Sequence, residues 1–214
     1  MQVELISPNV TKYLRVKLDK VTIDYLWKII AIGKTKNIDY KKKLIGNISQ
    51  SLLLEDIDSY FFKTVCTPLV NFYRENDSSK SDPCEINTFL KPESELRLSD
   101  IWVNFQYKTE FNPYHDHLGV YSFAIWLKIP YDWQEQNLLP QFQGIHDNNK
   151  KAGSFEFEYI DTLGGVRNTG YKLSKNLEGT MLFFPAKLRH CVYPFYGTDE
   201  PRISISGNLM YVSS

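Results

Sequence analysis

The sequence contains few cysteines, and no two of them lie close together. The three cysteines are Cys66, Cys84 and Cys191. Their odd number and wide spacing fit neither a disulfide framework nor a zinc ribbon built on Cys-X-X-Cys pairs. We therefore expect three free thiols in a reducing compartment, which favours a cytoplasmic location.

The sequence also lacks long apolar runs and an excess of charge of either sign. No stretch approaches the roughly 18 apolar residues that span a bilayer. The opening MQVELISPNVTKY has neither a basic start nor an apolar run, so no signal peptide is expected. Lys and Arg number 25, as do Asp and Glu, which argues against an extended nucleic-acid surface. The run Lys41-Lys42-Lys43 is interpreted as a solvated helix face.

The residues that are present have the composition of a soluble globular protein rich in aromatic rings. Hydrophobic residues make up 43% and charged residues 23% of the 214 residues, which disfavours disorder and suits one domain with a filled core. Aromatic residues reach 14%. We expect most of these rings to fill a β-rich interior.

Apolar residues follow the helical period over the first 95 residues. One such stretch covers 21–32, and Gly33, which follows it, is expected to end the helix. A second stretch covers 40–54. A third covers 57–73, where Pro68 should kink or split the helix because proline lacks the N–H donor. One apolar stripe is expected in the third stretch, made of Phe61, Val65, Leu69 and Phe72.

After residue 95 the period becomes two, as in strands. The alternating segments are 101–107, 121–129, 154–159, 180–184, 190–195 and 202–212. Short strands at near-regular spacing, with Gly, Pro and Asn in the turns, favour an antiparallel barrel or sandwich. We predict an α+β, mainly β fold. Residues 96–214 form a double-stranded β-helix (a jelly-roll or cupin-like barrel), braced by helices of residues 1–95 in one compact unit.

The candidate chemistry centres on four histidines. His115 and His117 flank Asp116 at the entry to a strand, and residues i and i+2 of an extended chain share a face. His190 is the remaining histidine in a strand-like context, and it is the candidate third metal ligand. His146 lies in a polar loop and is expected to be a surface residue. For the first pair, a polar strand end or a pH-sensitive patch is the alternative interpretation.

The strand that follows His190 supports an internal site. On it, Arg202, Ser204 and Ser206 share one face, whereas Ile203 and Ile205 take the other. An arginine that points into an apolar barrel needs an anionic partner, and a ligand carboxylate supplies one. The alternative is an exposed strand face on which the arginine side chain reaches solvent.

These motifs together resemble the iron(II)- and 2-oxoglutarate-dependent oxygenases. The resemblance rests on His115-Asp116-His117, on the strand Gly179–Pro185 followed by His190, and on Arg202-Ile203-Ser204. It covers residues 100–212. The segments 112–117 and 202–208 are similar to a branch of this family found in bacteria and their phages.

The resemblance implies an iron(II) site formed by His115, His117 and His190, with 2-oxoglutarate as cosubstrate and O₂ as oxidant. Better-known branches have a carboxylate at the position of His117, so this chain implies a neutral three-histidine face. Two other ligand sets remain open. A bulge brings Asp116 inward in one of them. In the other, His117 is paired with Gly119 beside an empty position, as in halogenating members.

The resemblance also implies that Arg202, with Ser204, binds the distal carboxylate of 2-oxoglutarate. Asn104 and Gln106, on the polar face of an earlier strand, are candidate contacts to cosubstrate or substrate. Candidate residues at the mouth of the site are Tyr114 and Trp126. The expected reaction is a hydroxylase-type oxidation of an unidentified small molecule or protein side chain, coupled to decarboxylation of 2-oxoglutarate.

Two other functions remain open. A three-histidine cupin-type dioxygenase would use the same ligands without 2-oxoglutarate and would have no use for Arg202. A non-enzymatic jelly-roll module would bind carbohydrate or a structural partner on aromatic rings. The long polar loop 132–153 is a candidate for substrate access. The oligomeric state is open.

Overall fold

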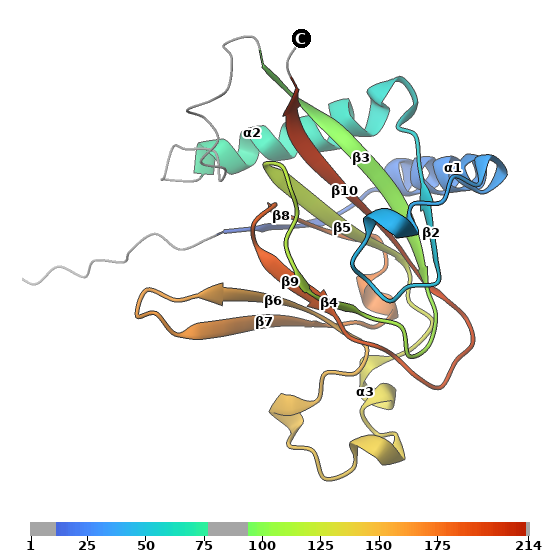
Figure 1. Cartoon of the computed structure of the whole chain (residues 1–214), viewed down its shortest axis with the longest axis vertical. Helices are drawn as coiled ribbons and strands as arrows, with labels where there is room; N and C mark the ends of the chain where they lie inside the picture. Colours follow the sequence, from blue (N-terminus) through green and yellow to red (C-terminus); the bar gives the residue numbers. More distant parts are fainter. Residues whose placement is uncertain (1–11, 77–93, 213–214) are drawn as a thin grey trace, which may run out of the picture.

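The computed structural model describes residues 12–76 and 94–212, which form two antiparallel sheets that face each other (Figure 1). The larger sheet has six strands in the order β1-β8-β5-β10-β3-β2, and the smaller has four in the order β4-β9-β6-β7. The strands are β1 Leu14–Lys17, β2 Gln50–Leu53, β3 Glu95–Gln106, β4 Asn112–His115, β5 Tyr121–Lys128, β6 Ser154–Ile160, β7 Val166–Lys172, β8 Thr180–Pro185, β9 Arg189–Val192 and β10 Arg202–Val212.

The helices are few and belong mostly to the first part of the chain. The α-helices are α1 Lys20–Lys36, α2 Thr67–Asn76 and α3 Trp133–Gln136. A π-helical turn covers Phe62–Cys66, and 3₁₀ turns cover Lys41–Lys43, Ile57–Ser59, Pro140–Phe142, Asp147–Asn149 and Lys175–Leu177. The prediction of a mainly β, α+β fold with a double-stranded β-helix is confirmed.

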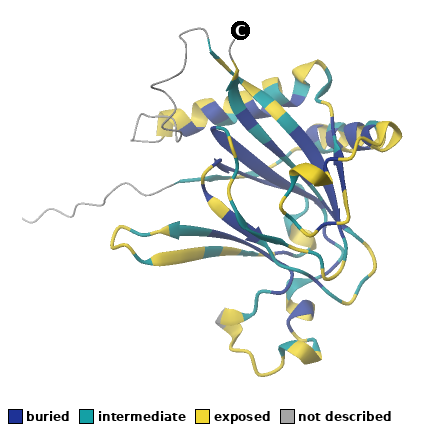
Figure 2. Ribbon diagram, in the orientation of Figure 1, coloured by how far each residue is buried: buried dark blue, intermediate teal, exposed yellow. Residues whose placement is uncertain are grey.

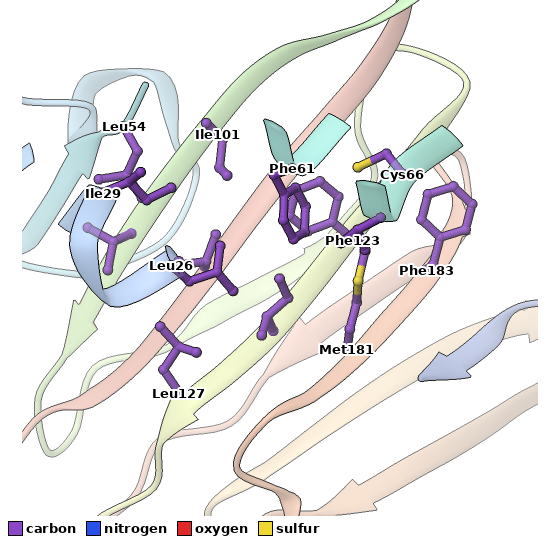
Figure 3. Close-up of a cluster of buried hydrophobic side chains, with 14 of the residues drawn as sticks. Leu26, Ile29, Leu54, Phe61, Cys66, Ile101, Phe123, Leu127, Met181 and Phe183 are labelled. Carbon is purple, nitrogen blue, oxygen red and sulfur yellow. The ribbon is translucent and has the colours of Figure 1, made fainter. Parts of the chain in front are cut away.

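The main core lies between the larger sheet and the helices that cover its outer face (Figure 3). Leu26 and Ile29 of α1 join Phe61, which precedes the π turn, and Phe123 of β5. The rings of Phe61 and Phe123 lie 5.4 Å apart. A second cluster, with Trp126 among its members, fills part of the space between the two sheets. The larger sheet lies between these two apolar clusters, and the central parts of its strands are buried (Figure 2).

The alternation on β10 divides the molecule into a core side and a cavity side. Ile203 and Ile205 pack in the helix-covered core. Arg202, Ser204 and Ser206 line a cavity between the sheets. The period of two along this strand therefore separates the residues that stabilise the fold from those that face the cavity.

The helix of the third apolar stretch changes its register at Pro68. Proline has no N–H to donate, and the turn before it is π-helical, with the N–H of Thr67 bonded to the carbonyl of Phe62. The extra residue in this turn rotates the helix that follows. Val70 and Tyr73 are buried, whereas Phe72 is 53% exposed. The expected stripe that continued to Phe72 is wrong for this reason.

The stretch 40–54, expected to be helical, is largely a loop and a strand. It contains the 3₁₀ turn Lys41–Lys43 and β2, whose residue Ser51 pairs with Asn104 of β3. Pairing along the sheet edge satisfies the backbone of β2, and this tertiary contact overrides the local periodicity. The solvated face predicted for the lysine run is confirmed in a 3₁₀ turn, since all three side chains are exposed.

Gly33 does not end the first helix. The helix α1 continues to Lys36 and ends at Asn37, whose left-handed backbone (φ 48°) forms the C-cap. A Cβ atom at Gly33 would lie 2.5 Å from Leu54 Cδ2. The glycine therefore allows the helix to approach the chain beside β2.

The first 95 residues also supply strands that the periodicity did not indicate. β1 pairs with β8, and β2 pairs with β3, so both belong to the larger sheet. The division into 1–95 and 96–214 stays a prediction. Cys66 and Cys191 are free thiols, and Cys84 lies outside the described residues. None of the helices in the described ranges is long and apolar enough to cross a membrane.

We expect Phe61→Ala to destabilise the protein by about 3–5 kcal/mol, because it removes a fully buried ring from the contact with Phe123. Urea unfolding followed by circular dichroism measures the change. The matched control is Phe72→Ala, on the other side of the π turn, which should cost less than about 1 kcal/mol. Equal losses in the two variants would contradict the register shift.

Candidate metal centre

Three histidines from separate parts of the sequence meet between the two sheets. His115 ends β4, His117 follows two residues later, and His190 lies on β9. β4 pairs with β9 so that His115 is opposite His190. One ligand atom from each of the three lies within 4.8 Å of the others. Spacing of this kind suits three ligands of one metal ion.

Backbone carbonyls fix the orientation of two of the rings. His115 Nδ1 donates to the Pro113 carbonyl at 2.7 Å, and His190 Nδ1 donates to the Leu188 carbonyl at 3.0 Å. A ring that donates from Nδ1 keeps its lone pair on Nε2, which is the atom left to bind a metal. Nε2 of His190 lies 3.2 Å from Nε2 of His117.

Burial keeps the three imidazoles uncharged. It lowers the pKa of His117 to about 4, and the repulsion that two protonated rings would exert makes the neighbouring His115 lower it further. Burial also lowers the pKa of His115, and it lowers that of the almost inaccessible His190 well below its usual range. At neutral pH the lone pairs are therefore available to a cation, since only neutral imidazole binds metal.

The structure does not bring Asp116 into this cluster. Its carboxylate is exposed and accepts a hydrogen bond from Lys187 Nζ at 3.0 Å. Gly119 has a structural reason to lack a side chain: its φ is +104°, and a Cβ there would lie 2.6 Å from the Leu209 carbonyl oxygen. His146, as expected, is exposed in the loop before β6.

The cluster opens into a cavity of about 180 Å³ between the sheets. The histidines form part of one wall. The opposite wall belongs to the larger sheet, with Arg202, Ser204 and Ser206 from β10. The same wall also contains Trp102, Asn104, Gln106 and Trp126.

Arg202 is a buried cation in this cavity. It is 1% exposed, and it donates to the hydroxyl of Tyr131 and to Oε1 of Gln106. The rings of Tyr131 and Phe195 flank the guanidinium, at 5.9 and 5.7 Å from its carbon atom to their centroids. Within residues 12–76 and 94–212, no carboxylate forms an ion pair with it. A buried charge without a counter-ion is costly, so the site fits a ligand that brings a carboxylate.

The other candidate residues have different positions. Asn104 lines the cavity and accepts a hydrogen bond from Ser51 Oγ at 2.6 Å. Gln106 also donates to the Glu110 carbonyl at 2.5 Å, and Trp126 lines the cavity. Tyr114 is not among the lining residues found in the described part of the chain; its hydroxyl donates to Glu156 on the smaller sheet at 2.5 Å.

Sequence reasoning missed two residues of this site. Tyr131 follows Pro130, beyond the alternating segment of β5, so no period indicated that its hydroxyl meets Arg202. Trp102 was not predicted to be a site residue. The alternation of its strand could have indicated it, since Trp102 shares a face with the candidate residues Asn104 and Gln106.

The family model described as "Putative 2OG-Fe(II) oxygenase" matches residues 100–208. Two solved structures share the fold. A prolyl-4-hydroxylase from Pseudomonas putida is 11% identical with a TM-score of 0.53, over 94% of this chain and 92% of that one. A prolyl hydroxylase from Trichoplax adhaerens, in complex with a hypoxia inducible factor peptide fragment, is 9% identical with a TM-score of 0.52, over 94% and 83%. None of the curated proteins matches the chain.

We expect His190→Ala to weaken zinc(II) binding by about 100-fold or more, because it removes one of the three candidate ligands that cluster between the sheets. Isothermal titration of the purified chain with zinc(II) at neutral pH measures the affinity. Asp116→Ala is the control and should change the affinity by less than about twofold, since that carboxylate is paired with Lys187. A comparable loss in both variants would count against the three-histidine ligand set.

Proposed function

The chain belongs to the family of 2OG-Fe(II) oxygenases, and on this premise we propose that His115, His117 and His190 hold iron(II) while Arg202 binds the distal carboxylate of 2-oxoglutarate. Membership makes the protein an oxidoreductase of the hydroxylase type, which uses iron(II), 2-oxoglutarate and O₂. The assignment of these roles to individual residues is the proposal.

The observation that carries it is the combination of ligands and charge in one cavity. Three neutral imidazoles line it together with a buried guanidinium that has no carboxylate partner among the described residues. A dicarboxylate can bind a metal held by the histidines with one end and pair with the guanidinium of Arg202 with the other end. The favoured ligand set is the three-histidine one, because the exposed carboxylate of Asp116 is bonded to Lys187 and does not belong to the histidine cluster.

The chain's own residues do the positioning. The carbonyls of Pro113 and Leu188 hold two imidazoles with Nε2 toward the cluster. Tyr131 and Gln106 hold the guanidinium fork from both sides, so that little freedom is lost when a carboxylate binds. When bound, the iron supplies the chemistry that couples reduction of O₂ to decarboxylation of 2-oxoglutarate and oxidation of the substrate.

Neighbouring side chains complete the cosubstrate site in this proposal. Ser204 is next to Arg202 on the cavity face of β10, and its hydroxyl is available to the same carboxylate. Asn104, which pairs with Ser204 across β3 and β10, is a further polar contact. Trp126 and Phe155 form an apolar wall that excludes water, which strengthens charge interactions inside the cavity.

The substrate in this proposal is a small molecule or a protein side chain. The similar prolyl hydroxylase from Trichoplax adhaerens holds a peptide, and this supports a substrate that extends from the cavity to the surface. The loop 132–153, which contains α3, is the proposed access element. A cytoplasmic location is part of the proposal, since the free thiols of Cys66 and Cys191 and an iron(II) site suit a reducing compartment.

The two other functions left open by the sequence are less well supported. A cupin-type dioxygenase without 2-oxoglutarate leaves the buried charge of Arg202 without a counter-ion. A binding module without a metal leaves three imidazoles, that of His190 buried and the other two half-buried, facing one another with no cation between them. Both the charge and the imidazoles have a role in the oxygenase.

We expect Arg202→Ala to raise the Kd of 2-oxoglutarate for the manganese(II)-loaded protein by about 100-fold, because the carboxylate loses a buried, charge-assisted partner. Titration calorimetry measures this binding, and release of carbon dioxide from labelled 2-oxoglutarate measures turnover by the iron(II) form. Arg97→Ala is the control, since that exposed side chain pairs with Glu95 away from the cavity. Unchanged binding and turnover in the Arg202 variant would favour a dioxygenase that does not use 2-oxoglutarate.

A further inference from the structure

Two of the side chains that line the cavity, Trp102 on β3 of the larger sheet and Asn112 on β4 of the smaller sheet, contain a buried hydrogen-bonding atom without a partner within residues 12–76 and 94–212. Trp102 is 3% exposed, and its indole Nε1–H meets no acceptor. The carboxamide oxygen of Asn112 is also buried and meets no donor, and the side chain forms no other hydrogen bond in these ranges. Buried groups of this kind carry a desolvation penalty unless a ligand or water satisfies them.

The remaining buried polar side chains of the cavity are paired with one another or with the backbone. Asn104 accepts from Ser51, and Gln106 is bonded to Arg202 and to the Glu110 carbonyl. Trp102 and Asn112 therefore differ from them: both lie in the same cavity as the histidines, and both are left for something that the chain itself does not supply.

Strand register places Trp102 at the metal end of the cavity. Across β3 and β10, Gln106 is opposite Arg202 and Trp102 is opposite Ser206. Four residues of extended chain separate the two pairs by about 13 Å. The ring of Trp102 has its centroid 6.0 Å from that of His117. The unpaired indole is therefore beside the metal ligands and far from the end that takes the cosubstrate carboxylate.

Both side chains are held in place without a ligand. The indole of Trp102 stacks on Tyr40, with centroids 5.2 Å apart, and Tyr40 is itself buried. The carboxamide of Asn112 packs against Gly46, where a Cβ would lie 1.4 Å from its oxygen. Any larger residue at position 46 would displace this carboxamide. Fixed groups of this kind bind a ligand with little further loss of conformational entropy.

We propose that Trp102 and Asn112 bind an amide group of the substrate. The indole N–H donates to the amide carbonyl, and the Asn112 carboxamide oxygen accepts from the amide N–H. A neutral group with one acceptor and one donor satisfies both side chains, whereas a carboxylate offers Asn112 no N–H and an ammonium offers Trp102 no acceptor. This deepens the proposed function and rests on it. A peptide bond and a side-chain carboxamide share the required chemistry.

The test uses the full chain labelled with ¹⁵N and loaded with zinc(II) and 2-oxoglutarate. The chain contains four tryptophans, whose indole N–H signals are separated from the backbone signals in a ¹H–¹⁵N spectrum. Trp102→Phe identifies the signal of interest by its loss. The probes are N-acetylalanine methylamide for the peptide bond, propionamide for the carboxamide, and methyl propionate as an acceptor that lacks an N–H.

We expect both amides to shift the Trp102 signal in a saturable way, and to bind about tenfold more tightly than the ester. The amide with the lower Kd identifies the source of the group. Asn112→Ala should weaken the amides about tenfold and leave the ester unchanged, so that the difference between them is lost. Trp133→Phe is the matched control, since its indole already donates to Ser154 Oγ at 2.9 Å, and it should leave these titrations unchanged.

A Trp102 signal that no amide moves, or that amides and ester move with equal affinity, overturns the proposal. Binding of zinc(II) and 2-oxoglutarate is measured first on the same sample. If these two do not bind, the proposed function fails, and the amide site fails with it. If they bind and the indole does not respond, only the amide site is wrong.

Discussion

The pairing of β4 with β9 is the contact on which the candidate metal centre depends. It sets His115 opposite His190 on adjacent strands, although 75 positions separate them in the sequence. Carbonyls on the same two segments then fix both rings, because Pro113 and Leu188 each accept a hydrogen bond from Nδ1. His117 needs only to follow along the extended chain to complete the cluster. One strand pairing thus determines which imidazoles meet and which of their nitrogen atoms remain free.

Charge gives this cavity its specificity. The larger sheet contributes a guanidinium that is almost inaccessible to solvent, and the smaller sheet and its extension contribute three neutral rings. Apart from the metal, the cavity therefore carries a positive charge at the end away from the histidines. A ligand that brings carboxylates stabilises such a site, and this electrostatic requirement connects the family's chemistry to the side chains present here.

Much of this arrangement could be predicted wherever a residue pattern was regular. Period two along β10 separated Arg202, Ser204 and Ser206 from Ile203 and Ile205, and the structure has them on these faces. The local pattern was misleading where long-range contacts decided the conformation. The stretch 40–54 has helical periodicity, but it supplies a strand because the edge of β3 offers it hydrogen-bonding partners.

By itself, the sequence determined the residue types of the site and the faces they occupy, because the alternation of an extended chain is a local property. It left open whether His117 or Asp116 lies beside His115 and His190, and it contained no signal for the contact of Tyr131 with Arg202. Only the tertiary structure decided these matters. Which side chains meet across two sheets depends on strand register and on the folding of distant segments, and the pattern of neighbouring residues determines neither of them.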